Sequence, residues 1–105
     1  MASTDASASQ TRVTAAGAGT TVDFTTAKRN VSAIMQVTGT VTGGVVAIEA
    51  SHDGAVWAKI HVMGPTTGFN QAFDNKFGAY RYWRSRVLTE ITGGGDVSTT
   101  FMEAG

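Results

Sequence analysis

Apolar and polar side chains alternate along several short segments of this chain. In residues 30–38 (NVSAIMQVT) one phase is apolar throughout, and it holds Val31, Ala33, Met35 and Val37. A period of two residues is typical of a β-strand with one buried face, because successive side chains point to opposite sides of the strand. We therefore predict a strand over residues 30–38 whose odd-numbered side chains face the core.

A hairpin is predicted in the middle of the chain. In residues 45–51 (VVAIEAS) the even positions are apolar: Val46, Ile48 and Ala50. The opposite phase contains Glu49, so the even positions should face the core. Residues 51–54 (SHDG) are typical of a turn, because Asp supplies a local acceptor and Gly tolerates a positive φ. Residues 56–63 should then return antiparallel to residues 45–51.

The two tryptophans are predicted to anchor the core. Trp57 falls out of phase with Ile60 and Val62 in the returning strand of the hairpin. A β-bulge resolves such a conflict, and so does a side chain that covers the edge of a sheet. We expect the bulge or an irregular entry into the strand. Trp83 lies in a second alternating segment, described next.

Two more segments complete the regular strands. In residues 79–89 (AYRYWRSRVLT) the phase expected to face the core holds Trp83, Ser85 and Val87. The outward phase of this segment holds Tyr80, Tyr82, Arg84 and Arg86. After three consecutive glycines at 93–95, residues 96–102 place Val97, Thr99 and Phe101 on one face.

The remaining segments are less regular. Residues 12–16 and 20–25 are two short candidate strands, divided by the turn-prone residues 17–19. Residues 64–76 (GPTTGFNQAFDNK) contain the single Pro and are predicted to be a loop, of a length that commonly binds a partner. Residues 1–11 (MASTDASASQT) contain no large apolar side chain that could offset the entropy of ordering them, so we predict a flexible N-terminal arm.

Together these segments predict an all-β protein of about seven strands. Leu occurs once, whereas Thr and Val fill 27 of the 105 positions and Gly fills 13, so residues of strands and turns dominate. Short strands with turn signals about every ten residues are typical of an antiparallel β-sandwich. We predict one sandwich domain over residues 12–105, in which the pattern leaves jelly-roll and immunoglobulin-like connectivity open.

Charge and composition narrow the classes of partner. Eight Lys and Arg balance eight Asp and Glu, so the chain lacks the basicity of many nucleic-acid binders and we expect no nucleic-acid partner. There is no Cys, so disulfides and thiolate metal sites are excluded. No segment approaches the about 20 apolar residues of a membrane helix, and the N-terminal residues do not resemble a signal peptide. We expect a soluble, unexported chain without a membrane partner.

No constellation of residues predicts catalysis. Ser51, His52 and Asp53 are the residue types of a catalytic triad, but three consecutive turn residues cannot easily place Ser and Asp on opposite nitrogens of one imidazole. His52 and His61 are too few for a convincing metal site. We expect no enzymatic activity, no metal and no cofactor.

Two regions are candidate partner-binding sites. Tyr80, Tyr82, Arg84 and Arg86 form one stripe, and Tyr and Arg are the side chains favoured at interface hot spots. The alternative is a solvated face on which these arginines pair with carboxylates of neighbouring strands. The second candidate is the 64–76 loop, with Phe69 and Phe73 as its aromatic side chains.

Two stretches carry a resemblance to a known class of proteins. Residues 46–57 (VAIEASHDGAVW) resemble a pattern v-x-i-E-x-S-x-D-G-x-x-W, and residues 82–94 (YWRSRVLTEITGG) resemble its companion Y-x-R-x-x-V-t-x-i-t-G-G. The pair, about a quarter of the chain, is similar to small β-sandwich structural proteins of tailed bacteriophages, among them capsid decoration or cement proteins and tail components. It is more faintly similar to discoidin-like galactose-binding sandwiches.

The resemblance implies a non-enzymatic protein of the virion. A decoration protein of this kind would bind across subunits of the major capsid protein, stabilise the phage head and associate with copies of itself as a homo-oligomer. It would be made in the host cytoplasm and lie on the outer capsid surface. A tail or baseplate component and a carbohydrate-binding module are the alternatives.

Overall fold

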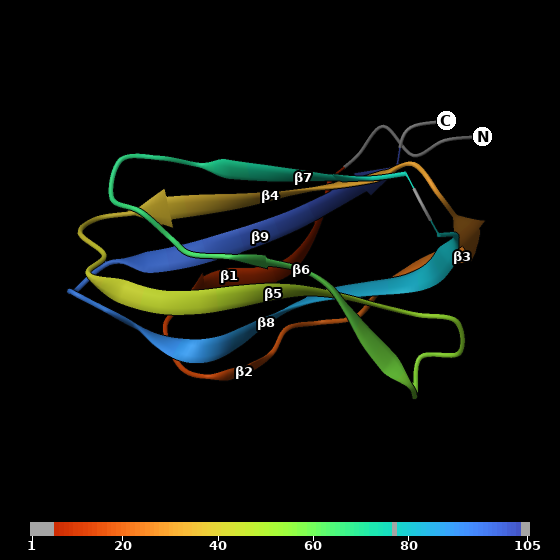
Figure 1. Cartoon of the computed structure of the whole chain (residues 1–105), viewed down its shortest axis with the longest axis horizontal. Helices are drawn as coiled ribbons and strands as arrows, with labels where there is room; N and C mark the ends of the chain where they lie inside the picture. Colours follow the sequence, from red (N-terminus) through yellow and green to blue (C-terminus); the bar gives the residue numbers. More distant parts are fainter. Residues whose placement is uncertain (1–5, 77, 104–105) are drawn as a thin grey trace.

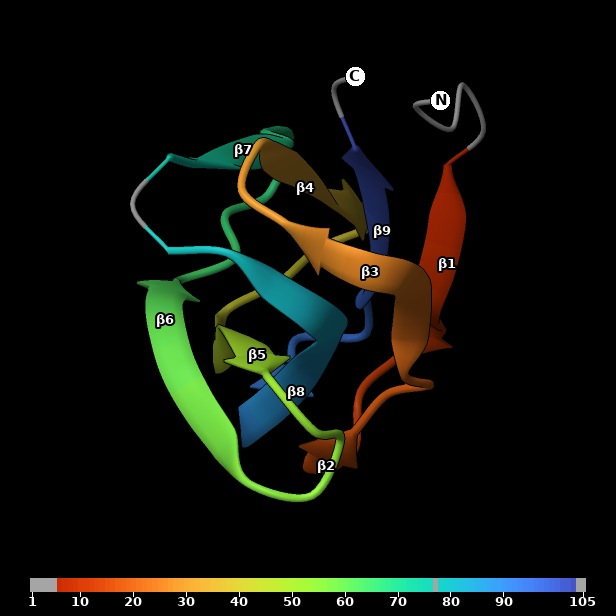
Figure 2. The same cartoon turned by 90° about the vertical axis from the view of Figure 1, so that its right-hand side faces the viewer.

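The computed structural model describes residues 6–76 and 78–103, and these residues form nine β-strands. The strands are β1 (Ser7–Val13), β2 (Gly17–Ala18), β3 (Val22–Lys28), β4 (Val31–Thr38), β5 (Gly43–Ser51), β6 (Trp57–Met63), β7 (Gln71–Asn75), β8 (Tyr80–Thr92) and β9 (Asp96–Glu103). Two sheets pack face to face, as Figures 1 and 2 show. The predicted all-β sandwich is confirmed.

The order of the strands identifies the connectivity. One sheet has the order β1-β9-β4-β7, and the other has the order β2-β8-β5-β6 with β3 also paired to β8. All pairs between these strands are antiparallel. When β2 and β3 are counted as one interrupted strand, the chain order in the sheets becomes 1-8-3-6 and 2-7-4-5. This is the order of a jelly roll, so the structure decides between the two predicted connectivities.

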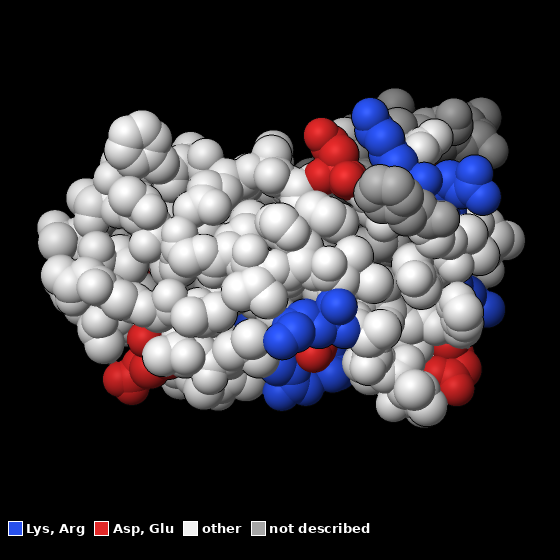
Figure 3. Space-filling view, in the orientation of Figure 1, with Lys and Arg blue, Asp and Glu red and all other residues white. Residues whose placement is uncertain are grey.

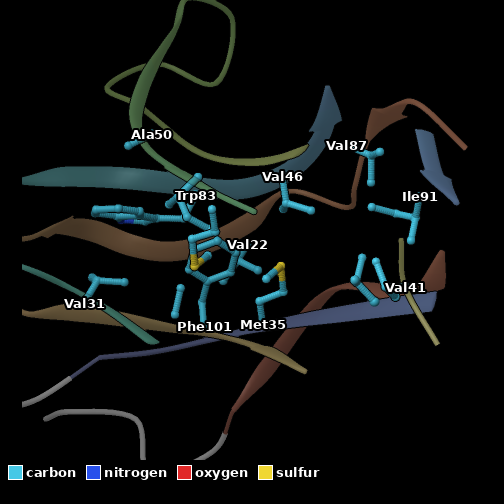
Figure 4. Packing of buried hydrophobic residues seen from close by; sticks show 14 residues of the cluster. Val22, Val31, Met35, Val41, Val46, Ala50, Trp83, Val87, Ile91 and Phe101 are labelled. Carbon is cyan, nitrogen blue, oxygen red and sulfur yellow. The ribbon is translucent and has the colours of Figure 1, made fainter. Parts of the chain in front are cut away.

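Side chains from both sheets fill the space between the layers (Figure 4). The largest of those that are fully buried are Trp83 and Ile48 from the five-stranded sheet and Met35 and Phe101 from the four-stranded sheet. Each lies in the phase that alternation assigns to the core. The phases predicted for β4, β5, β8 and β9 are therefore confirmed, and Trp83 is a core anchor.

The central hairpin contains the predicted bulge, but Trp57 is not in the core. In the pairing of β5 with β6, Ile48 lies opposite His61 and Glu49 lies opposite Lys59, so Ile60 is the extra residue. Ser51 pairs with Trp57, which places the indole on the outer face of the sheet beside Glu49. The prediction that Trp57 anchors the core is wrong, because the bulge separates its phase from that of the residues beyond it.

The N-terminal segment is a strand and not a flexible arm over residues 7–11. β1 pairs with β9, and Ser9 and Gln10 are buried although neither is apolar. Polar bonds offset the cost of ordering this segment: the Ser85 amide donates to Ser9 Oγ at 2.9 Å, and Ser85 Oγ donates to Gln10 Oε1 at 2.8 Å. Residues 1–5 of the predicted arm lie outside the described residues.

These polar bonds also join the two sheets along one side of the sandwich. Ser9 Oγ donates to the carbonyl of Thr20 at 2.8 Å, and the Thr20 amide donates to the carbonyl of Ser9 at 2.7 Å. A β-carbon at Gly19 would overlap Gln10 and Ser9, so only glycine permits this approach. β1 thus pairs with one sheet and hydrogen-bonds to the other.

Three other boundaries differ from the prediction. The predicted loop 64–76 contains β7, so the irregular connection is limited to residues 64–70. The candidate strand 12–16 lies mostly beyond the end of β1, and the candidate strand 20–25 is found as β3, which begins at Val22. β7 escaped notice because Gln71–Asn75 contains one large apolar residue, too few to show alternation.

Candidate functional site

The outer face of the five-stranded sheet carries a group of charged and aromatic side chains. The register of β5 with β8 places Glu49 opposite Arg84 and Ala47 opposite Arg86. The register of β5 with β6 places Glu49 opposite Lys59. Since residues opposite one another on antiparallel strands share a face, these side chains converge from three strands. We call Glu49, Trp57, Arg84 and Arg86 the arginine cluster.

Glu49 binds both arginines of the cluster. Arg84 Nε donates to Glu49 Oε1 at 2.7 Å, and Arg86 Nε donates to Oε1 at 3.1 Å and to Oε2 at 3.2 Å. The side chains of Glu49 and Arg84 are only 12% and 17% exposed, whereas that of Arg86 is 35% exposed. The ion pairs are therefore partly shielded from water, which makes them stronger than fully exposed pairs.

Trp57 fixes the position of Arg84 from the other side. The Arg84 guanidinium carbon lies 4.0 Å from the centre of the Trp57 ring, in the geometry of a cation–π contact. Trp57 Nε1 donates to the carbonyl of Gly54 at 3.2 Å, which ties the indole to the hairpin turn. Arg84 is thus held between a carboxylate and an aromatic ring.

Some hydrogen-bond donors of the arginine cluster have no acceptor within the described residues. Only the Nε atoms of Arg84 and Arg86 hydrogen-bond within the described residues, so their terminal amino groups remain free to bind a ligand. With the exposed Lys59, three cations and one carboxylate leave this face a formal charge of +2. Figure 3 shows a group of basic atoms around acidic atoms at the lower margin of the molecule, below β5 and β6 of Figure 1.

Three of the four residues of the predicted stripe lie on this face. Arg84 and Arg86 point outward as expected, and Tyr82 pairs with Ser51 on the same side. Tyr80 does not join them: its ring contacts the edge of Trp83 at 5.6 Å and stacks on His52 at 5.1 Å. Tyr80 is the first residue of β8, where the strand enters the sheet, and it packs against the core.

A second arginine pair lies next to Tyr82. Arg81 donates two hydrogen bonds to the carboxylate of Asp23, at 2.7 and 2.9 Å, and its guanidinium carbon lies 4.9 Å from the Tyr82 ring centre. The hydrogen bond with Arg81 lowers the pKa of Asp23, and the amide of Thr25 adds to this effect. The same bond with Asp23 raises the pKa of Arg81.

The two phenylalanines of the predicted loop have different environments. Phe69 lies in the 64–70 connection and is 67% exposed. Phe73 lies on β7, where its ring stacks on His61 at 4.7 Å and packs against the core. Phe73 is therefore less accessible to a partner than Phe69. Within the described residues, no hydrogen bond or ring contact joins Phe69 to the arginine cluster.

The Ser-His-Asp sequence of the hairpin stabilises a turn. The Ser51 hydroxyl hydrogen-bonds to Asp53 Oδ1 at 3.1 Å, and the His52 ring stacks on Tyr80 instead of lying between Ser51 and Asp53. Asp53 Oδ1 also accepts from the amides of Ala55 and Val56, each at 2.9 Å. The bonds from Val56, Ala55 and Ser51 lower the pKa of Asp53. This arrangement is an Asx turn and not a catalytic relay.

Sequence reasoning missed two members of the cluster. Glu49 was recognised only as belonging to the outward phase, and Trp57 was assigned to the core. No local signal identifies either residue, because a two-residue Asp-Gly turn would place Ser51 opposite Val56, whereas the structure pairs Ser51 with Trp57.

Three general observations complete the site. Within residues 6–76 and 78–103, no three His, Cys, Asp or Glu side chains gather where they could hold a metal ion. The described part of the chain contains no helix with the length and apolar character needed to cross a membrane.

No protein-family model matches the chain, and no curated protein or solved structure matches it significantly.

Proposed function

We propose that this chain is a capsid decoration protein of a tailed bacteriophage, a non-enzymatic protein that binds across subunits of the major capsid protein and stabilises the head. The arginine cluster carries the proposal. It combines two arginines with an aromatic ring on an open sheet face, and this is the side-chain chemistry of protein interfaces. The resemblance of residues 46–57 and 82–94 to phage structural proteins includes every member of the cluster.

The cluster is suited to a partner that presents carboxylates. Glu49 and Trp57 already hold Arg84 in place, so little side-chain entropy is lost when its amino groups bind. Arg86 is more exposed, and its guanidinium can bind a carboxylate in the bidentate geometry that favours arginine over lysine. An acidic segment on the capsid surface would therefore bind to guanidinium groups that are already oriented and carry the opposite charge.

The shape of the molecule favours binding a surface over binding a small molecule. A hollow of about 400 Å³ at residues 30–32 and 74–76 is open to solvent and lies away from the arginine cluster. Jelly rolls are common among viral capsid proteins and lectins, although a fold does not by itself decide a function.

The proposal is tested with capsids of the phage that encodes the chain, assembled without it. Arg86→Ala removes one exposed guanidinium while Arg84 keeps its bond to Glu49, so the fold should be retained. We expect binding to weaken by about tenfold to a hundredfold and to weaken further at raised salt. Arg12→Ala is the matched control, since Arg12 also pairs with a carboxylate, Asp96 at 3.2 Å, but lies on the other sheet.

The outcomes separate the alternatives. Equal binding of wild type and Arg86→Ala to capsids would contradict the arginine cluster as the interface. Binding to isolated tails, with none to heads, would make the protein a tail or baseplate component. Retention on immobilised polysaccharide, displaced by free sugar, would support the carbohydrate-binding alternative.

A further inference from the structure

The outer face of the four-stranded sheet is almost free of charge. Its side chains alternate with the buried ones along β4 and β9, and they are Ser32, Ile34, Gln36, Ser98, Thr100 and Met102. The neighbouring strands add Ala72 opposite Ile34 and Ala8 opposite Thr100. We call these eight residues the uncharged face.

Two large apolar side chains lie exposed on the uncharged face. Ile34 is 51% exposed and Met102 is 36% exposed, although both are on strands with neighbours on each side. A shallow hollow of about 90 Å³ lies beside them, lined also by Ser32, Thr100 and Ala6. This volume is comparable to that of one aliphatic side chain, so the hollow can receive a side chain from an opposing surface.

Charged groups on this sheet lie at its ends. Asp74 is on β7 opposite Ser32, near one end of β4, and the Arg12–Asp96 pair lies near the other end, where Asp96 is opposite Thr38. A partner that placed a charged side chain on the uncharged face would leave that charge buried and unpaired.

We propose that the uncharged face binds the same face of a second copy of this chain in a two-fold dimer. The other outer face cannot be the complementary surface, since it carries Glu49, Lys59, Arg84 and Arg86. The uncharged face matches itself, and in a two-fold contact Ile34 of each copy enters the hollow of the other. Two such sheets can stack as the sheets of a sandwich do.

The dimensions of the face are those of a weak, reversible dimer. Its four strands have seven, eight, eight and five residues, which rise about 3.3 Å each on strands about 4.8 Å apart, so the flat area is about 440 Å². Two copies would bury about 900 Å² together, just below the size at which specific interfaces begin. The contact is therefore expected to be reversible at micromolar concentrations.

Two of the sheet edges, β6 and β1, are poorly suited to self-association. On β6 the bulge at Ile60 and the exposed Lys59 interrupt regular pairing with a further strand. On β1 the register shifts between Ala8 and Val13, and Arg12 has a positive φ of 48°. These features disfavour edge-to-edge pairing between copies at β6 and at β1.

The inference goes beyond capsid binding and is measured on the pure protein. The two outer faces lie on opposite sides of the sandwich (Figure 2), so self-association leaves the arginine cluster of each copy uncovered. Failure of capsid binding would leave this inference intact, and failure of self-association would leave the capsid proposal intact.

Sedimentation equilibrium between about 5 and about 500 µM tests the dimer. The wild type should pass from monomer to dimer over this range. Ile34→Lys should weaken association about a hundredfold or more, because each dimer would bury two unpaired ammonium groups. Val62→Lys makes a similar change on the opposite outer face, where Val62 is 43% exposed, and it should associate like the wild type.

Two further measurements keep the dimer testable if the first variant misfolds. Met102→Lys serves as a second variant if circular dichroism shows that Ile34→Lys misfolds. In the wild type, oxidation of Met102 by peroxide should slow as the protein concentration rises, while Met35, which is fully buried, stays slow throughout. A wild type that remains monomeric at the highest concentration, or a dimer that Ile34→Lys and Met102→Lys leave unchanged, would overturn the proposal.

Discussion

The two outer faces of this sandwich differ in charge far more than in backbone. Both are built from antiparallel strands whose inward residues fill one core. On the five-stranded sheet the outward residues include Glu49, Arg84 and Arg86, which bind one another, whereas on the four-stranded sheet Ile34 and Met102 lie among small uncharged side chains. The comparison teaches that the inward side chains of both sheets must be apolar to form one core. The outward side chains are not constrained in this way, so the two faces can differ in the partners that they suit.

The largest expected effect comes from removing the strand that joins the two sheets. Deleting residues 1–10 removes an edge of the uncharged face and the bonds of Ser9 and Gln10 to Ser85. The loss of these bonds adds to the loss of the pairing between β1 and β9. We expect the truncated chain to lose cooperative thermal unfolding, as followed by circular dichroism. A melting curve equal to that of the full chain would show that β1 is dispensable.

Substitution of the two tryptophans distinguishes a residue of the core from a residue of the outer face. Trp83→Ala empties a fully buried site and should cost about 3–5 kcal/mol of the free energy of unfolding. Trp57→Ala removes an outer-face contact with Arg84 and should cost about 1 kcal/mol, and under the proposed function it should also weaken capsid binding. Denaturant unfolding of both variants checks the order. Equal losses of stability would mean that Trp57 belongs to the core after all.

Removing the carboxylate of the arginine cluster should have an intermediate effect. Glu49→Gln keeps the size of the side chain but leaves Arg84 and Arg86 close together without a counter-charge. We expect a loss of about 1–3 kcal/mol. Asp96→Asn on the other sheet breaks a more exposed pair, because Arg12 is 69% exposed, and should cost about 0–1 kcal/mol. Chemical denaturation that ranks the two variants in reverse would contradict the shielding of the cluster.

The smallest expected effect is a change in thermal stability at acid pH. The pKa of Asp53 in the folded protein lies below the unfolded value of 3.8, so its stabilisation is present above pH 3.8 and is lost as the pH falls through the folded pKa. Asp53→Asn should therefore melt below the wild type at neutral pH, and the two melting temperatures should converge below pH 3.8. A difference that is constant with pH would show that the charge of Asp53 does not support the hairpin that holds Trp57.

The sequence predicted best those strands in which apolar and polar residues alternate and the apolar residues are the buried ones. In β4, β5, β8 and β9 the apolar phase is the buried phase, so Trp83 and the outward direction of Arg84 could be assigned together. β1 could not be assigned in this way, because Ser9 and Gln10 are buried by hydrogen bonds to residues more than 70 positions away. No local pattern carries that information.

The candidate site was predictable in part for the same reason. Arg84 and Arg86 lie opposite the phase of Trp83, and their pairing with a carboxylate of a neighbouring strand was one of the two alternatives. The identity of that carboxylate depends on the register of β5 with β8, and the position of Trp57 depends on a bulge. Glu49 engages only the Nε atoms, so the pairing leaves the terminal amino groups of both arginines without a partner among the described residues.

One measurement tests most directly that the two faces bind different partners. Arg86→Ala and Ile34→Lys are each sedimented with capsids assembled without the protein, at a concentration where wild type saturates the particles. The account predicts that Arg86→Ala loses most of its occupancy and Ile34→Lys keeps it, while only Ile34→Lys fails to dimerise in the absence of capsids. Loss of capsid binding by Ile34→Lys, with full binding by Arg86→Ala, would contradict the assignment of the faces.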